Sequence, residues 1–225
     1  MRPIVVAIDG PSGVGKSTLG RALAARLGCS FVESGAMYRA MGLKAIEAAV
    51  DPKDAAAVIA LVEQARIEFR EGPAGMRVLL DGRDVTERIR AADVTDAASV
   101  VSIIPRVREL MVAQQRAMGA GPRGVVMEGR DIGTVVFPQA DVKVYLDAAA
   151  EVRSARRFAD GETPSQISES VVREQLAERD RRDRTRAASP LMAADNAVQI
   201  DSSQLSASQV LEQVWALVES VAARK

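Results

Sequence analysis

The hydrophobic positions of the chain form short β-branched runs that alternate with longer stretches in which apolar residues recur at helical spacing. The first run covers 4–8 (IVVAI), and in the stretch 17–27 three leucines stand four positions apart. A short apolar run is typical of a buried parallel strand, and the leucine spacing is typical of an amphipathic helix. The pattern therefore predicts a strand and then a helix, with Gly28 as the cap of that helix.

The same alternation continues along most of the chain. Further strands are predicted at 30–33 (SFVE), 124–127 (GVVM), 142–146 (VKVYL) and 197–200 (AVQI). Helical patterns cover 36–49, 93–118 with a break at Pro105, 148–158, 168–184 and a terminal stretch that Ser206 would cap. Strands that alternate with helices predict an α/β fold, with a five-stranded parallel sheet flanked by helices.

The stretch 66–90 has a different character. IEFR and MRVLLDG read as two strands joined by the turn EGPAG, and DVTERIR reads as the start of a helix capped by Thr86. We therefore expect a small antiparallel insertion here. A second break, DGETPS at 160–165, is rich in turn residues and lies between two charged helical stretches.

Composition and charge remove several functional classes. The 30 basic and 30 acidic residues cancel and aromatic residues make up 3%, which argues against a nucleic-acid partner. The chain has no histidine, so a Ser-His-Asp triad, a histidine base and histidine metal sites are excluded. The apolar N-terminal stretch is too short for a signal peptide, and we expect a soluble, cytoplasmic protein without a membrane partner.

The segment 10–17 (GPSGVGKS) matches the phosphate-loop pattern G-x-x-x-x-G-K-[ST]. Its glycines let backbone N–H groups surround phosphate oxygens, and the helix that follows adds its positive end. Lys16 would reach the β- and γ-phosphates, and the Ser17 hydroxyl would bind Mg²⁺. The predicted strand and helix on either side supply the required context. The loop predicts binding of a nucleoside triphosphate, but it does not identify what receives the phosphoryl group.

Two later segments carry groups suited to a second nucleotide. Ser34, Tyr38 and Arg39 follow the strand SFVE directly, although Ser34 would also serve as an ordinary helix cap. Further on, Ser99 precedes a helix that carries Arg108. This arginine would suit a phosphate, but it would equally suit a solvated helix face.

Two more segments add carboxylates to arginines. Glu128 ends the strand GVVM, where a Walker-B carboxylate helps to hold Mg²⁺ or its water, although an ordinary turn has the same appearance. In the run RDRRDRTR, helical spacing would place Arg179, Asp183 and Arg186 on one face. Such a face suits a phosphate with a base or sugar, but an exposed helix with internal salt bridges remains the alternative.

Taken in order, these segments resemble the bacterial cytidylate kinases. The resemblance is carried by IDGPSGVGKST, SGAMYRA, DAASVVSIIPRVRE, GRDIGTVVFPQADVKVYLDA and ERDRRDRTRAASPL, and it extends from residue 4 to about 201. It implies a P-loop kinase that transfers the γ-phosphoryl group of ATP to CMP or dCMP with Mg²⁺. It also implies a core at about 1–60 and 95–225, a nucleoside-monophosphate-binding insertion at about 61–94 and a lid at about 153–168. We expect the kinase to be a monomer.

The resemblance also implies a set of site residues. Residues expected to bind ATP are Gly10, Pro11, Ser12, Gly13, Val14, Gly15, Lys16, Ser17, Thr18, Arg156 and Arg157. Residues expected to bind CMP are Ser34, Tyr38, Arg39, Ser99, Arg108, Arg130, Asp131, Asp183 and Arg186. Residues expected to act on the transferring phosphoryl group are Lys16, Arg130, Arg179 and Arg184. The resemblance is weakest in the lid, and Glu128 stands where the family commonly has Asp.

Three alternatives stay open on the residues themselves. The first is a kinase of the same class that acts on another acceptor, such as UMP or a small metabolite. The second is a regulatory or assembly module that binds ATP without transferring it. The third, nucleic-acid binding, is disfavoured by the charge and the aromatic content.

Overall fold

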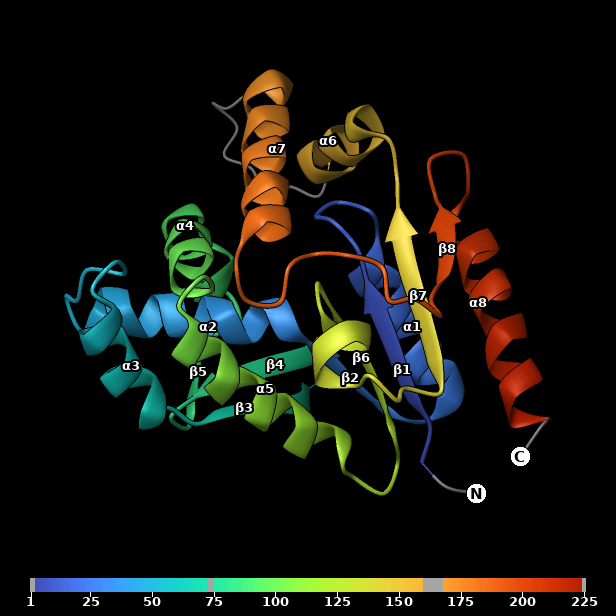
Figure 1. The fold of residues 1–225 in the computed structure, drawn as a ribbon, viewed down its shortest axis with the longest axis horizontal. Helices are drawn as coiled ribbons and strands as arrows, with labels where there is room; N and C mark the ends of the chain where they lie inside the picture. The colour runs from blue at the N-terminus through green and yellow to red at the C-terminus, as the bar shows by residue number, and fades with distance from the viewer. Residues whose placement is uncertain (1–2, 73–74, 160–167, 224–225) are drawn as a thin grey trace. The chain divides into compact units, whose positions relative to one another are not determined.

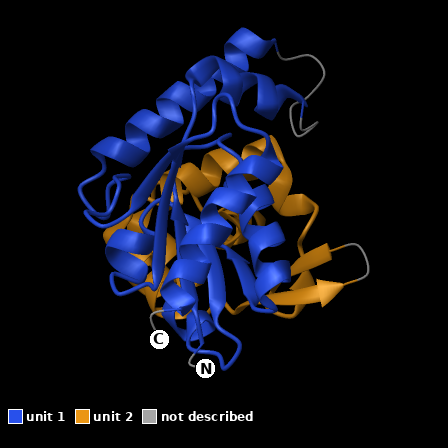
Figure 2. Cartoon of the chain, turned by 90° about the vertical axis from the view of Figure 1, so that its right-hand side faces the viewer, with its two compact units in different colours: residues 1–33, 115–225 blue, residues 34–114 orange. Residues whose placement is uncertain are grey.

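The computed structural model describes residues 3–72, 75–159 and 168–223 of the chain. These residues form two compact units, which are coloured separately in Figure 2. Unit 1 comprises 1–33 and 115–225, and unit 2 comprises 34–114. The predicted insertion at about 61–94 lies within unit 2. The whole DGETPS break and half of the predicted lid lie outside the described residues.

Unit 1 contains the five-stranded parallel sheet that the sequence predicted. Its elements, labelled in Figure 1, are β1 (Val5–Asp9), α1 (Lys16–Leu27), β2 (Ser30–Glu33), β6 (Val125–Gly129), η2 (Ile132–Val136), β7 (Val142–Asp147), α6 (Ala150–Ala159), α7 (Glu169–Thr185), β8 (Val198–Asp201) and α8 (Ala207–Ala222). The strand order is β2-β6-β1-β7-β8, and every neighbouring pair is parallel. The connections that leave β1 and β6 thus start from the same edge of the sheet, where α/β proteins bind ligands.

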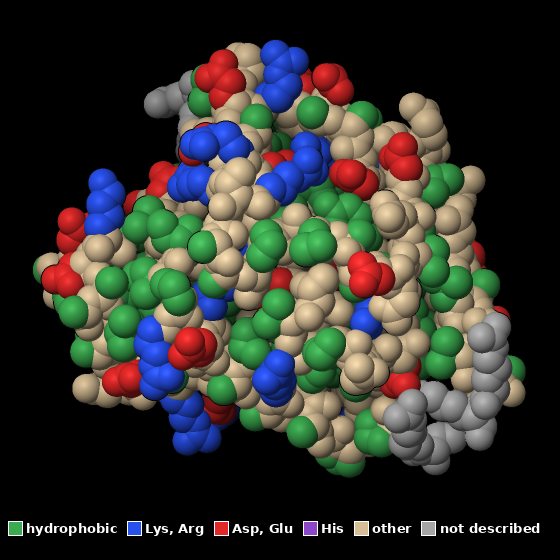
Figure 3. Space-filling view, in the orientation of Figure 1, with side chains coloured by type: hydrophobic (Ala, Val, Ile, Leu, Met, Phe, Trp, Pro, Cys, Tyr) green, Lys and Arg blue, Asp and Glu red, His purple; other side chains and the backbone are tan. Residues whose placement is uncertain are grey.

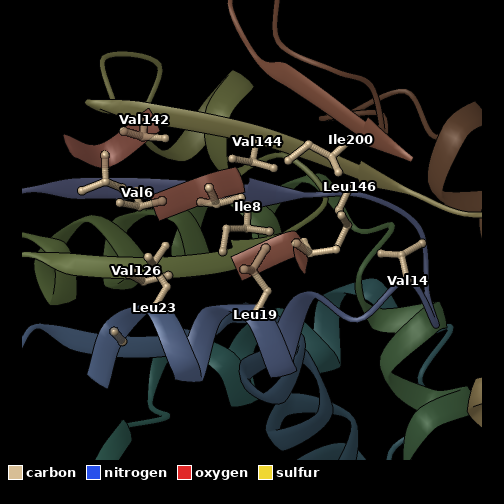
Figure 4. Close-up of a cluster of buried hydrophobic side chains, with 14 of the residues drawn as sticks. Val6, Ile8, Val14, Leu19, Leu23, Val126, Val142, Val144, Leu146 and Ile200 are labelled. Atoms are coloured by element: carbon tan, nitrogen blue, oxygen red, sulfur yellow. The ribbon is translucent and has the colours of Figure 1, made fainter. Parts of the chain in front are cut away.

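The core of unit 1 lies between this sheet and the helices α1 and α8. Figure 4 shows side chains from β1, β6 and β7 packed against Leu19 and Leu23 of α1. These two leucines are among the three whose spacing predicted the helix, and both are buried. Val14, from the loop between β1 and α1, belongs to the same cluster. Burial of Val14 ties the conformation of that loop to the core.

The ends of the helices follow the predicted signals. Gly28 adopts a left-handed conformation after α1, and its N–H donates to the carbonyl oxygens of Ala24 and Ala25. Ser206 caps α8: its hydroxyl accepts from the N–H of Gln209, whose side chain returns a bond to the Ser206 N–H. This reciprocal pair is a capping box. The predictions of Gly28 and Ser206 as caps are therefore confirmed.

Unit 2 combines helices with a small antiparallel sheet. Its elements are α2 (Ser34–Glu47), α3 (Ala55–Glu63), β3 (Ile67–Gly72), β4 (Gly75–Leu80), β5 (Arg83–Asp84), η1 (Arg88–Arg90) and α4 (Ala92–Val101), and α5 (Pro105–Gly119) continues into unit 1. β3 and β4 pair in antiparallel fashion, as predicted, and β5 adds a short third strand. In α2, Gly42 allows close packing, since a Cβ atom there would lie 2.7 Å from the Ala98 nitrogen of α4.

One element of unit 2 was predicted wrongly. The segment after the hairpin forms only a three-residue 3₁₀ turn, η1, and Thr86 does not cap it. Instead, the Thr86 hydroxyl accepts from the N–H of Val78 in β4 and donates to Asp84 at 2.6 Å. The Thr86 side chain, which the sequence predicted as a helix cap, therefore bonds to β4 and β5 instead.

In the part of the chain that the structure describes, no helix is both long enough and apolar enough to cross a membrane.

Candidate functional site

The loop after β1 carries the Gly-rich motif and passes very close to the neighbouring strand. Gly10 has a φ of 149°, and a Cβ atom here would lie 2.0 Å from the carbonyl oxygen of Leu146 in β7. Only glycine fits at this position. Gly13 and Gly15 have φ angles of 81° and 95°, and α1 begins directly afterwards at Lys16. The loop thus meets the N-terminus of a helix, an arrangement that binds phosphate oxygens.

The Lys16 side chain is buried beneath this loop. Its Nζ donates to the carbonyl oxygen of Pro11 at 2.6 Å and lies 3.9 Å from the Glu128 carboxylate. Burial, reinforced by the charge of Arg130, lowers the pKa of Lys16 to about 7. A bound polyphosphate would favour the protonated form, because an opposite charge stabilises an ammonium group. The lysine is therefore placed to respond to an anion in the loop.

Ser17 and Glu128 place oxygen atoms together where β6 ends beside α1. The Ser17 hydroxyl donates to the Glu128 carboxylate at 2.9 Å, and Glu128 is buried. Hydroxyl and carboxylate oxygens are the ligand types that Mg²⁺ prefers. Among the described residues, no group of three or more His, Cys, Asp or Glu side chains is placed to hold a metal ion. The pair fits an ion that also takes ligands from nucleotide phosphates and water.

Arg130, the residue after β6, connects the phosphate loop to α7. Its Nε donates to Asp183 at 2.8 Å and its Nη2 donates to the Ser12 hydroxyl at 2.5 Å. Burial alone would lower the pKa of Arg130, but the Asp183 and Glu128 carboxylates hold it above its usual value. The guanidinium therefore remains charged beside the loop.

The Asp183 carboxylate lies among several arginine side chains. Arg186 Nη1 lies 3.5 Å from Asp183, and Arg186 Nη2 lies 3.9 Å from Asp131. Burial raises the pKa of Asp183, but Arg130 and Arg179 overcome this effect and keep the pKa below its usual value. The helix α7 ends at Thr185, so Arg186 reaches Asp183 from the extended residue after the helix and not from the predicted helical face. The structure nevertheless brings these predicted residues together.

In unit 2 the predicted residues lie on three helices. Ser34, Tyr38 and Arg39 occupy the first two turns of α2, which begins at Ser34 itself. The Arg108 guanidinium of α5 lies 5.2 Å from the centre of the Tyr38 ring, within the range of a cation–π contact, and donates to the Ser102 carbonyl oxygen. Ser99 lies in the last turn of α4, and its carbonyl oxygen accepts from the hydroxyl of Ser102, the residue directly after the helix. Tyr38, Ser99 and Arg108 thus belong to one connected group.

The arginines predicted for the lid differ in their surroundings. Arg156 donates to the carbonyl oxygen of Val14 and to both oxygens of Ser202, so it contacts the backbone of the phosphate loop. Arg157 is half-buried on the same helix, and Arg184 is exposed near the end of α7. Figure 3 shows positive and negative side chains side by side over α7. On this helix the exposed Arg181 and Glu178 form a salt bridge.

A protein-family model, described as cytidylate kinase, matches residues 6–220. The cytidylate kinase of Solibacter usitatus is 47% identical over 220 residues, which cover 96% of this chain and 93% of that protein. The cytidylate kinase of Corynebacterium glutamicum is 47% identical over 223 residues and covers 98% of this chain and 96% of its own. The chain belongs to the cytidylate kinase family.

The solved structures agree on the fold. A gluconokinase from Sinorhizobium meliloti superposes with a TM-score of 0.51 at 15% identity, covering 99% of this chain and 95% of that one. A protein from Eubacterium ventriosum gives a TM-score of 0.52 at 8% identity, covering 96% of this chain and 99% of that one. At these identities the likeness concerns the fold alone, and it agrees with the α/β sheet of a P-loop kinase.

The sequence analysis missed Asp9, a buried carboxylate in this cytidylate kinase family member. Both Asp9 oxygens accept backbone N–H groups from the single π-helical turn η2, at 2.8 Å from Ile132 and 2.7 Å from Gly133. The bonds hold the segment that begins with Arg130 and Asp131 against the end of β1. The available signal was an acidic residue directly before a Gly-rich loop, but its partners are more than 120 residues away. It also missed the pair formed by Arg153 and Asp180.

The carboxyl group of Asp9 predicts a measurable dependence of stability on pH. Burial raises its pKa to about 7, against the lowering effect of the two hydrogen bonds, and Asp131 adds to the rise while Lys16 opposes it. The folded state therefore holds this proton from the unfolded pKa of 3.8 up to about 7. Its contribution to stability is fully present below that range and is lost as the pH rises through it.

Asp9→Asn should remove this dependence. From pH 4 to pH 7, the unfolding free energy of the wild type relative to the variant should fall by about 1–4 kcal/mol. Urea unfolding at several pH values measures this difference. The exposed Asp195 supplies a matched control, since the unfolding free energy of Asp195→Asn should change with pH as that of the wild type does. A difference in unfolding free energy between the wild type and Asp9→Asn that stays constant with pH would contradict the raised pKa of Asp9.

Proposed function

We propose that this protein transfers the γ-phosphoryl group of ATP to CMP or dCMP, producing ADP and CDP or dCDP in pyrimidine nucleotide metabolism. Membership of the cytidylate kinase family is the observation that carries the proposal. The connection from the phosphate loop through Arg130 to Asp183 supports it, because phosphoryl transfer needs a donor site and an acceptor site side by side. We place the reaction in the cytoplasm and assign it to a monomer.

The donor half of the site would be the loop 10–18. Its backbone and Lys16 would bind the triphosphate. Arg156 and Arg157 would also contact ATP, from the helix α6 beside the loop. Ser17 and Glu128 would hold Mg²⁺ together with phosphate oxygens, and the ion supplies charge neutralisation at the bridging phosphates when it is bound. The hydrogen bond between these two side chains supports this pairing.

The acceptor half would use the predicted arginines as phosphate ligands and the polar residues around them for the base and sugar. Residues proposed to bind the acceptor are Ser34, Tyr38, Arg39, Ser99, Arg108, Arg130, Asp131, Asp183 and Arg186. The planar guanidinium fork matches two phosphate oxygens at once. Asp183, held ionised among arginines, offers oxygen acceptors to the amino or hydroxyl groups of the nucleoside.

The reaction itself needs little covalent chemistry from the protein. An oxygen of the acceptor phosphate attacks the γ-phosphorus, the bond from this phosphorus to the β–γ bridging oxygen breaks, and ADP leaves with that oxygen. The attacking oxygen is already deprotonated at neutral pH, so no general base is required, in agreement with a chain that lacks histidine. Lys16, Arg130, Arg179 and Arg184 would neutralise the charge that moves between the phosphates.

An acceptor panel tests this assignment. ADP release from ATP should be measured in a coupled assay with CMP, dCMP, UMP and AMP in turn. We expect release that depends on CMP or dCMP, with kcat/KM for UMP and AMP lower by about tenfold or more, because a site that pairs the groups of cytosine leaves polar atoms unpaired with other bases.

The other outcomes of the panel discriminate among the alternatives. Faster release with UMP would assign the site to a uridylate acceptor. ADP release without any acceptor, or ATP binding without release, would favour a regulatory module of the same fold. Either result would overturn the proposed acceptor while leaving the donor site in place.

A further inference from the structure

Two side chains that were not among the predicted site residues, one from α6 and one from α7, contact the same residue of the phosphate loop. Arg153 of α6 and Asp180 of α7 form a buried ion pair. The N–H group of Ser12 donates to Asp180 Oδ1 at 3.4 Å, and Arg153 Nη1 donates both to the Asp180 carboxylate and to the Ser12 carbonyl oxygen, the latter at 3.2 Å. The ion pair therefore binds both backbone polar groups of a single loop residue.

Packing fixes the loop against the same helix. A Cβ atom on Gly13 would lie 2.9 Å from the carbonyl oxygen of Arg153, so the backbones of the loop and of α6 are in close contact. Arg153 Nε also donates to the Ala148 carbonyl oxygen at 3.2 Å. Burial of two charges is unfavourable, and a well-packed apolar pair often joins two helices equally well. What an apolar pair would lack is the bonds to the loop peptide.

The ion pair is also connected to the residues proposed for the acceptor. Asp180 and Asp183 are three residues apart in α7 and hence on neighbouring positions of one helix face. Asp183 binds Arg130, whose other end binds the Ser12 hydroxyl. Ser12 is thus held through its backbone by the ion pair and through its side chain by Arg130. A shift of the Ser12 peptide acts on Asp183 by both routes.

A triphosphate in the loop would interact unequally with the two members of the pair. Its negative charge attracts Arg153 and repels Asp180, so its binding free energy depends on how these two side chains are arranged. A ligand shifts a conformational equilibrium only through such a difference in binding free energy between the conformations. A carboxylate beside a phosphate-binding loop weakens anion binding unless a cation offsets it. The ion pair of Arg153 and Asp180 is therefore suited to change its arrangement when the triphosphate binds, and it is not suited to bind the triphosphate itself.

On the basis of the proposed function, we propose that Arg153 and Asp180 are positioning residues that couple the donor site to the acceptor site. Donor phosphates that fix the Ser12 peptide also fix α7 through Asp180, and α7 then presents Asp183 and Arg179 to the acceptor. Binding of ATP and of CMP is therefore cooperative, and each nucleotide raises the affinity for the other by the same factor.

The coupling factor is the quantity to measure. Isothermal titration calorimetry gives the Kd of CMP with and without a saturating non-hydrolysable ATP analogue. In the wild type, we expect the analogue to lower this Kd by about 5–150-fold, the usual range of coupling between two sites. In Asp180→Asn and in Arg153→Gln the ratio should fall to about two or less, while the Kd of CMP alone changes much less than the ratio.

Two further variants separate positioning from a structural role. Arg153→Met combined with Asp180→Leu replaces the ion pair by an apolar pair that is expected to fold with at least the wild-type melting temperature. It should still lose the coupling, since the bonds to Ser12 are gone. The exposed pair of Arg181 and Glu178 on the same helix is the matched control, and Glu178→Gln should keep the wild-type ratio.

Three results would overturn the proposal. One is a wild-type ratio of one, and another is an unchanged ratio in the folded apolar double variant. The third is an equal loss in Glu178→Gln, which would show that any change on α7 disturbs binding. A failure of the proposed function looks different, because the wild type itself would then not release ADP in response to CMP.

Discussion

Lys16→Ala should lower kcat with ATP and CMP by about 10²–10³-fold, the usual loss when one group that stabilises transition-state charge is removed. The lysine is a cation beneath the loop, 3.9 Å from Glu128, and the loop 10–17 itself contains no other charged side chain. The fold should survive, since the glycines and the Val14 anchor that shape the loop are unchanged. Steady-state kinetics together with a melting curve measure both effects.

The exposed Lys53 provides the control for this substitution. Lys53→Ala removes the same charge from a surface position and should retain the wild-type kcat. Near-normal phosphorylation of CMP by a folded Lys16→Ala variant would contradict the role of the phosphate loop as the donor site.

Asp183→Ala should raise KM for CMP by about 30-fold or more, because truncation of one partner of a buried charge pair costs 2–5 kcal/mol and leaves the other partner unpaired. The partners left behind are Arg130 at 2.8 Å and Arg186 at 3.5 Å. KM for ATP should rise far less, since the partners of the Asp183 side chain among the described residues are arginines outside the loop. Kinetics with each nucleotide varied in turn give both constants.

The exposed Asp195 again supplies a matched change, and Asp195→Ala should leave both constants unaltered. Equal losses for CMP and ATP in Asp183→Ala would assign the residue to general support of the site and would remove it from recognition of the acceptor.

Local signals predicted the parts of the fold that local interactions determine. The apolar runs marked all five parallel strands, and Gly28 and Ser206 marked a helix end and a helix start, because each of these signals acts within a few residues. Thr86 misled for the same reason: its spacing suits a cap, but its hydroxyl bonds across the hairpin to Val78. The helix at 55–63 carried no expectation from the sequence, although Asp54 caps it.

The site residues also fall into those that local sequence signals predicted and those that they did not. The phosphate loop is continuous in sequence, so its residues were predicted together and its cradle follows from their spacing. Asp9, Arg153 and Asp180 were missed because each acts through partners that only the folded chain brings near. Arg153 in particular looks like one of several arginines on a charged helix. On that helix Arg156 and Arg157 were predicted as site residues, while the buried ion pair belongs to Arg153.

Transfer of the phosphoryl group from ATP to CMP is tested most directly by following the γ-phosphoryl group itself. The protein is mixed with ATP labelled at the γ-phosphorus and with CMP, the reaction is stopped within one turnover, and the nucleotides are separated. We expect the label to appear in the β-position of CDP at the rate at which ADP forms, with little free phosphate. Label recovered as inorganic phosphate, or retained in ATP while CMP is present, would contradict transfer between two nucleotides bound side by side.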